Sequence, residues 1–131
     1  MIVWKRIDTS KLNPLFKAAV DNVVGPLQTV WYATYGWRSR QEQASLYAKY
    51  KAGGPRAAPP GYSPHEFGLA IDVVLDENDK RDGLQPNWDV NDPRWQELIE
   101  VIRRSKWLHS GVSFGDAGHI ELVNWKSRTT E

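Results

Sequence analysis

Three segments of this chain have apolar residues at the spacing of an amphipathic helix. The first covers residues 9–27, where Thr9 and Ser10 are candidate caps at its start. The second covers residues 40–51 and follows Ser39, and the third covers residues 94–105 and is capped by Asp92 and Pro93. The positions expected on the inner faces of these helices are Leu15, Ala18, Ala19, Val23, Ala44, Tyr47, Ala48, Trp95, Leu98, Ile99 and Ile102.

Three further segments are predicted strands, because β-branched and aromatic residues dominate them or because polar and apolar residues alternate. They are residues 28–35, residues 69–75 and the short stretch 119–123. Residues 53–64 and 76–91 are rich in turn-forming residues and are predicted loops. Helices and strands alternate along the chain, which favours an α+β fold with helices flanking a small, mostly antiparallel sheet.

Length and composition are typical of a single globular domain. The 131 residues can build one core without further links, so we treat 1–131 as one domain. The net charge is +1, and no excess of basic residues indicates binding of nucleic acid. No apolar run is long enough to span a membrane. The N-terminus lacks the pattern of a secretory signal. Cysteine is absent, which excludes disulfides, a thiol nucleophile and cysteine-held zinc.

The predicted strand at residues 69–75 contains one carboxylate, Asp72, in an otherwise apolar run. A buried charge needs a partner or a cation, and a lone aspartate in a strand is more often explained by a salt bridge or an edge position. His65 lies shortly before this strand, and Gly68 lets the backbone turn between the two side chains. The histidine therefore favours a metal site over the simpler explanation.

A second histidine, His119, shares one face of the last strand with Glu121, while Ile120 and Leu122 take the other face. Two histidines and a buried aspartate offer three nitrogen and oxygen ligands, the number that a catalytic zinc site uses beside a water. Iron in a site of two histidines and one carboxylate is an alternative. That site usually places the first histidine and the acid closer together than they are here, so zinc fits better.

Asp116 lies between two glycines shortly before His119. Aspartate beside glycine is typical of turns, and a turn role is the simpler explanation. Next to a metal that lowers the pKa of its water, the same carboxylate is a candidate general base, which takes a proton and later returns it to the leaving amine. Glu121 is the rival base, unless it orients a ligand imidazole from behind.

Two motifs carry these residues, S-P-H-E-F-G-L-A-I-D at 63–72 and G-D-A-G-H-I-E at 115–121. Together with G-W-R-S-R-Q-E-Q at 36–43 they resemble the D-alanyl-D-alanine carboxypeptidase family of zinc peptidases. That family includes VanY-type carboxypeptidases, VanX-type dipeptidases and the L-alanyl-D-glutamate peptidases used as phage endolysins. The resemblance implies the core fold that these enzymes share with the Hedgehog signalling domain and with lysostaphin-like peptidases.

The resemblance also implies the roles of four residues in the two dense motifs. His65, Asp72 and His119 would hold Zn²⁺, and Asp116 would be the catalytic base. Many relatives carry glutamate at the position of Asp116, so the aspartate is a departure within the range of the family.

Further roles follow from the same resemblance. Arg38 would steady a carbonyl or carboxylate of the substrate, which suits a zinc site that stabilises an oxyanion, although a surface ion pair is its simpler explanation. Ser63 would hydrogen-bond the substrate or a ligand. Gln43 would give structural support, and Glu121 would support a ligand unless it is the base.

We therefore expect a zinc peptidase that acts on the peptidoglycan stem peptide. An L-alanyl-D-glutamate endopeptidase of the phage endolysin type is favoured over a D-alanyl-D-alanine carboxypeptidase, because the chain is small and shows no leader. A zinc-bound wall-binding module without turnover is the rival of a different class, and the intact Asp116 disfavours it. Near-neutral charge disfavours a nuclease. We expect a monomer, made in the cytoplasm, that acts on the cell wall and neither binds nucleic acid nor inserts into membranes.

Overall fold

The computed structural model describes residues 1–78 and 84–128, so residues 79–83 of the second predicted loop lie outside the described residues. The elements, with η for a 3₁₀ turn, are β1 (Ile2–Val3), α1 (Pro14–Val24), β2 (Trp31–Tyr35), α2 (Arg40–Lys51), η1 (Pro64–Phe67), β3 (Ala70–Asp76), β4 (Pro86–Asn87), α3 (Pro93–Arg104), β5 (Leu108–Ser110), η2 (Gly111–Phe114), β6 (His119–Leu122) and η3 (Trp125–Arg128). The predicted helices and strands are present, while β1, β4 and β5 are too short to show a periodicity. No helix among the described residues is long and apolar enough to cross a bilayer.

The described strands form one sheet, in the order β1-β2-β3-β6-β5, with β4 paired to β3. Only β1 runs parallel to its neighbour, and all the other pairs in the described chain are antiparallel. The predicted mostly antiparallel sheet is thus confirmed. Along the central strand, Asp72 is opposite Tyr35 of β2 on one side and His119 of β6 on the other.

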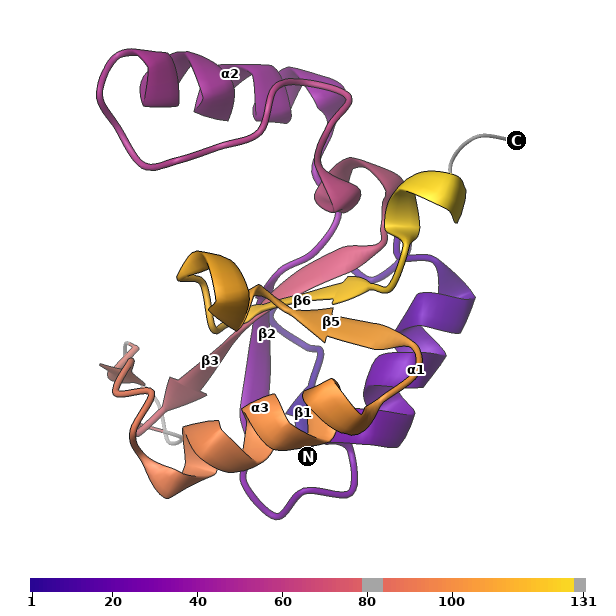
Figure 1. Cartoon of the computed structure of the whole chain (residues 1–131), viewed down its shortest axis with the longest axis vertical. Coiled ribbons are helices and arrows are strands. Elements are labelled where there is room, and N and C mark those ends of the chain that lie inside the picture. Colours follow the sequence, from indigo (N-terminus) through magenta and orange to yellow (C-terminus); the bar gives the residue numbers. More distant parts are fainter. Residues whose placement is uncertain (79–83, 129–131) are drawn as a thin grey trace.

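The core lies between one face of this sheet and the helices α1 and α3, which pack together on that side (Figure 1). Trp31 of β2 and Trp95 of α3 meet edge to face there, with ring centroids 4.7 Å apart. Alternate residues of β3 point into the same core. The remaining positions of the strand face the opposite side, and this side carries the candidate site.

The first helix starts later than predicted. Asn13 caps it, because its side-chain oxygen accepts hydrogen bonds from the backbone N–H groups of Leu15 and Phe16. The prediction of Thr9 and Ser10 as caps is therefore wrong. The buried stripe also differs, since Leu15 is 80% exposed and the predicted inner positions are exposed or half-buried. The fully buried residues of α1 are Phe16, Val20 and Val24.

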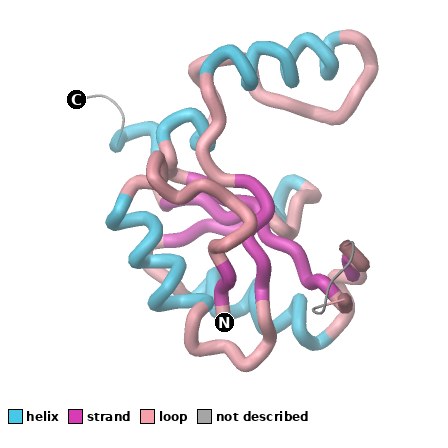
Figure 2. The backbone as a smooth tube through the Cα atoms, turned by 180° about the vertical axis from the view of Figure 1, so that it is seen from behind, coloured by secondary structure: helices cyan, strands magenta, loops and turns pink. Residues whose placement is uncertain are grey.

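The second helix departs most from its predicted environment. Ser39 does cap it, within a capping box, as the sequence indicates. The predicted apolar stripe is wrong, because Ala44 and Ala48 are exposed and Tyr47 is half-buried. Only Gln43 of this helix is buried. Figures 1 and 2 show α2 and the loop after it standing away from the sheet, which is where a helix without an apolar face can lie.

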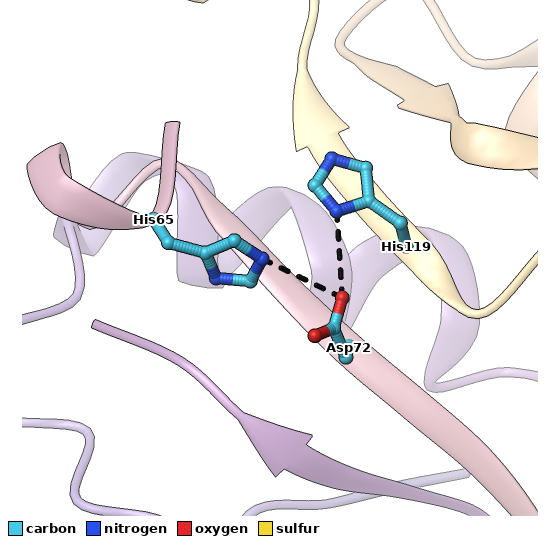
Figure 3. Close-up of side chains that lie close together, drawn as sticks. All are labelled: His65, Asp72 and His119. Atoms are coloured by element: carbon cyan, nitrogen blue, oxygen red, sulfur yellow. Dashed lines mark ion pairs between the residues drawn. The ribbon is translucent and has the colours of Figure 1, made fainter. Parts of the chain in front are cut away.

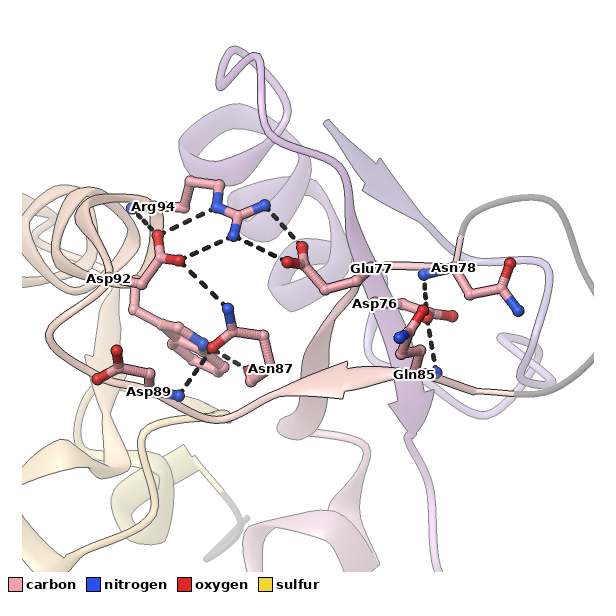
Figure 4. A network of polar contacts seen from close by, with 9 residues as sticks. Asp76, Glu77, Asn78, Gln85, Asn87, Asp89, Asp92 and Arg94 are labelled. Carbon is pink, nitrogen blue, oxygen red and sulfur yellow. Dashed lines mark hydrogen bonds and ion pairs between the residues drawn. The ribbon is translucent and has the colours of Figure 1, made fainter.

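A network of polar contacts ties the start of α3 to the end of β3 (Figure 4). Asp92 caps α3 by accepting from the backbone N–H of Arg94. The guanidinium of Arg94 in turn donates to Asp92 and to Glu77, at 2.8 Å and 2.7 Å. The carboxylates of Asp92 and Glu77 are therefore both paired with Arg94, in a structural contact between α3 and the end of β3.

Candidate metal centre

His65, Asp72 and His119 point toward one another on the face of the sheet opposite α1 and α3 (Figure 3). The Oδ1 atom of Asp72 lies 3.5 Å from Nε2 of His65 and 3.4 Å from Nδ1 of His119. The three ligand atoms all lie within 4.8 Å of one another. The structure thus brings together the three residues that the motifs single out.

The local sequence explains how each side chain reaches this point. Asp72 has core residues on either side in β3, so strand alternation turns it to the opposite face. His65 lies in η1, which Ser63 caps and Gly68 ends with a φ of 70°. A side chain at Gly68 would collide with the backbone of the segment before α1, so only glycine fits this turn. His119 opens β6 and pairs directly with Asp72.

Hydrogen bonds behind the imidazoles determine which nitrogen faces Asp72. Nδ1 of His65 lies 2.8 Å from the carbonyl oxygen of Gly36, and Nε2 of His119 lies 2.7 Å from Oε1 of Glu121. When a ring is neutral, its acceptor takes the N–H, and the other nitrogen keeps the lone pair that can bind a metal. Oδ1 of Asp72 is buried and has no hydrogen-bond partner among the described residues. Three lone pairs directed at one point are what a cation satisfies.

The donor set fits zinc. Two imidazole nitrogens and one carboxylate oxygen leave a fourth position for water, as in catalytic zinc sites. Both histidines are buried, and the second ring nitrogen of each is held by an acceptor, as is usual for metal-ligating histidines.

Without a cation, the same geometry shifts the pKa values of the group. Burial alone lowers the pKa of His119, but the carboxylates of Asp72 and Glu121 on either side of the ring outweigh it and raise the pKa to about 9. Burial alone raises the pKa of Asp72, but the two histidines hold it well below its usual range. A proton on His119 therefore compensates Asp72 in the metal-free site, and binding of a metal must displace that proton.

Asp116 lies in the turn between η2 and β6. Its backbone N–H donates to the carbonyl of Gly111 at 2.8 Å, and its carbonyl accepts from the N–H of His119 at 3.1 Å, so it does shape the turn. Asp116 is exposed, but desolvation of its carboxyl by the surrounding protein and the nearby charge of Asp72 raise its pKa. A carboxylate with a raised pKa beside the ligands is suited to accept a proton near neutral pH.

Arg38 follows β2 and is half-buried next to His65. Its backbone N–H donates to the carbonyl of His65 at 3.1 Å, and its guanidinium donates to Oε1 of Gln43 at 2.8 Å. The buried amide of Gln43 also donates to the carbonyl of Ala58 at 2.8 Å. Gln43 therefore fixes Arg38 against the loop that follows α2, which is the geometry of a structural support.

Ser63 is buried, and its hydroxyl accepts a hydrogen bond from the backbone N–H of His65 at 3.3 Å. This contact positions a ligand residue, while a contact of Ser63 with substrate stays a prediction. Gly36 and Glu66 also support the site but were not predicted. The spacing of Ser63 and Glu66 is that of a capping box, which is a signal for Glu66, whereas a backbone carbonyl such as that of Gly36 leaves no mark in the sequence.

Comparison with known proteins identifies the family. The sequence profile of the VanY family, D-alanyl-D-alanine carboxypeptidases, matches residues 7–113. The chain belongs to this family. The match contains Arg38, His65 and Asp72 but ends before Asp116 and His119, which the structure brings to the same place. The predicted resemblance and the predicted class, a hydrolase that acts on peptidoglycan, are confirmed.

Solved structures with a similar fold include an endopeptidase, a carboxypeptidase and a pentapeptidase. The L-Ala D-Glu endopeptidase ChiX of Serratia marcescens is 15% identical, with a TM-score of 0.65 over 98% of this chain and 93% of ChiX. The LD-carboxypeptidase LdcB is 23% identical, with a TM-score of 0.51 over 91% and 70% of the two chains. A variant of the D,D-pentapeptidase VanY in complex with Zn(II) is 17% identical, with a TM-score of 0.53 over 90% and 76%. These likenesses confirm the predicted fold.

Proposed function

We propose that this member of the VanY family is a zinc-dependent endopeptidase that hydrolyses the L-Ala–D-Glu bond of the peptidoglycan stem peptide. The observation that carries the chemistry is the convergence of His65 Nε2, Asp72 Oδ1 and His119 Nδ1, with Oδ1 buried and without a hydrogen-bond partner among the described residues. The Zn(II) complex of VanY supports zinc as the cofactor. The match to ChiX supports the bond, because it extends over nearly the full length of both chains.

Hydrolysis requires a base, an acid for the leaving amine and stabilisation of the oxyanion. Zinc bound at His65, Asp72 and His119 would polarise the scissile carbonyl and lower the pKa of the attacking water. Asp116 takes the proton from this water and returns it to the amine that leaves. Its raised pKa makes the carboxylate a stronger base for the first transfer. Arg38, whose guanidinium is held by Gln43, would supply the cation that stabilises the oxyanion.

Glu121 is disfavoured as the base. Its carboxylate accepts a hydrogen bond from the far nitrogen of His119 at 2.7 Å, which orients the imidazole and sets its tautomer. A carboxylate used in this way would have to release the ligand in order to take a proton from water. We therefore assign orientation to Glu121 and proton transfer to Asp116.

Two other functions remain as rivals, and product analysis separates them. The name of the family favours cleavage of terminal D-Ala–D-Ala. A wall-binding module would keep the metal but not turn over. The endolysin role and the monomeric state stay predictions.

The deciding experiment is digestion of purified peptidoglycan by the full chain, with and without a chelator, followed by mass spectrometry of the products. We expect fragments with a new N-terminal D-Glu, and no fragments after chelation. Release of free D-Ala would instead establish the carboxypeptidase. Retention on the wall without any product would contradict an enzyme and favour the binding module.

A further inference from the structure

The helix α2 and the loop after it, residues 40–62, form an arm that stands clear of the sheet (Figures 1 and 2). Nearly all side chains of α2 are exposed or half-buried, and Gln43 is its one buried residue. A short helix without an apolar face is marginal on its own in water. The arm therefore depends on its attachment at the base, and its outer surface is free to meet a partner.

The base of the arm is fixed beside the candidate zinc site. The buried carboxylate of Glu66 accepts from Nε of Arg40 and from the backbone N–H of Gly61, both at 2.9 Å, and so joins the two ends of the arm. Glu66 is the neighbour of His65 in η1. The first turn of α2 therefore lies beside the metal ligands, and the last turn lies at the outer end of the arm. A polymer bound along the arm can extend from this outer end to the site.

The arm is basic, whereas the rest of the chain is not. It contains four basic residues and the single acid Glu42, so its net charge is +3, and the remainder of this +1 chain carries −2. The carboxylate of Glu42 accepts a hydrogen bond from the backbone N–H of Ser39 at 2.9 Å. Lys49, Lys51 and Arg56 are exposed and form no ion pair with any described residue.

A purely local role explains only part of this charge. Lysines in the last turn of a helix interact favourably with its dipole, and Lys51 also lies over the ring of Tyr47 at 5.8 Å. Arg56 lies beyond the helix, and no acid follows Glu42 anywhere in the arm. Such a one-sign surface attracts an anionic polymer.

We propose that Lys49, Lys51 and Arg56 bind the carboxylates of stem peptides on the peptidoglycan polymer and hold the polymer against the site. This inference rests on the proposed function, which makes peptidoglycan the substrate. The polymer repeats its carboxylates along each strand, so several weak contacts act together. The arm should therefore affect the binding of polymer but leave the cleavage of a short stem peptide almost unchanged.

The test compares a variant that neutralises the arm, K49Q/K51Q/R56Q, with a matched variant elsewhere, K5Q/K106Q/K126Q. Each protein is sedimented with acid-extracted sacculi that lack phosphate polymers, and its kcat and KM are measured on these sacculi and on a short stem peptide.

We expect the arm variant to bind sacculi about tenfold more weakly, which is the loss that three exposed charge contacts would cause. Its kcat/KM on the short peptide should stay within about twofold of the wild type, since exposed charges away from the reacting atoms contribute little there. The matched variant should behave like the wild type.

Two controls separate charge from folding and from glycan contact. The variant K49R/K51R/R56K keeps the charges and should bind like the wild type. Sacculi whose carboxylates are converted to amides should bind the wild type as weakly as untreated sacculi bind the arm variant. Unchanged sedimentation of the arm variant, undiminished binding to amidated sacculi, or an equal loss on the short peptide would each overturn the inference. If the wild type cleaves neither substrate, the proposed function fails, and sedimentation alone decides the role of the arm.

Discussion

Asp72 lies between two imidazoles whose outer nitrogens are already hydrogen-bonded, and this arrangement could be predicted only in part. Its place in an apolar strand marks it as anomalous, and strand alternation puts His119 and Glu121 on one face, as the structure shows. The carbonyl of Gly36, which fixes the tautomer of His65, could not be predicted. The position of a backbone carbonyl depends on how the whole chain folds, and the residue type at that position does not reveal it.

Substitution of Asp116 separates proton transfer from metal binding. We expect Asp116→Ala to keep its zinc and to lower kcat by about 10²-fold or more, the usual range for a general base. A base must be ionised, so the kcat/KM of the wild type should fall as the pH drops through the raised pKa of Asp116, and this acid limb should vanish in the variant. Peptide hydrolysis over a range of pH, with metal analysis of the same samples, is the measurement. Normal cleavage by Asp116→Ala would transfer the role of base to Glu121.

Short elements position the ligands more than the long helices do. The turn η1 carries His65 and is closed by the capping box of Ser63 and Glu66. The sequence contains this box, but one turn of 3₁₀ helix has no periodicity from which it could be predicted. In α1, by contrast, the periodicity was visible, but two neighbouring stripes are apolar. The structure buries the stripe of Phe16, Val20 and Val24, which carries more apolar surface than the stripe of Leu15 and the two alanines.

Removal of Glu66 tests whether the capping box of η1 supports the metal site. Glu66→Ala leaves the backbone N–H groups of Gly61 and Ser63 without their acceptor, so we expect a loss of about 1 to 3 kcal/mol in the free energy of unfolding. Zinc affinity should fall as well, because His65 is the next residue. The matched control is Glu42→Ala, which removes the equivalent acid of the exposed box of α2. Chemical denaturation and zinc titration measure both effects, and equal zinc affinity in the two variants would show that η1 does not depend on Glu66.

The molecule as a whole follows the prediction in its order of elements, its α+β class and its mostly antiparallel sheet. Alternation of helices and strands with short connections allows few other arrangements. The parallel pairing of β1 with β2 and the separation of the arm from the core were not predictable. Two-residue strands carry no pattern, and a strong helix-forming composition says nothing about whether a helix meets a core.

The most direct test of this account is the metal content of the purified full chain, measured by elemental analysis. We predict about one zinc per chain in the wild type and in Asp116→Ala, and little or none in His65→Ala, since a catalytic zinc site depends on three protein ligands. Absence of zinc from the wild type after incubation with the metal, or undiminished zinc in His65→Ala, would contradict the assignment of His65, Asp72 and His119 as the metal centre.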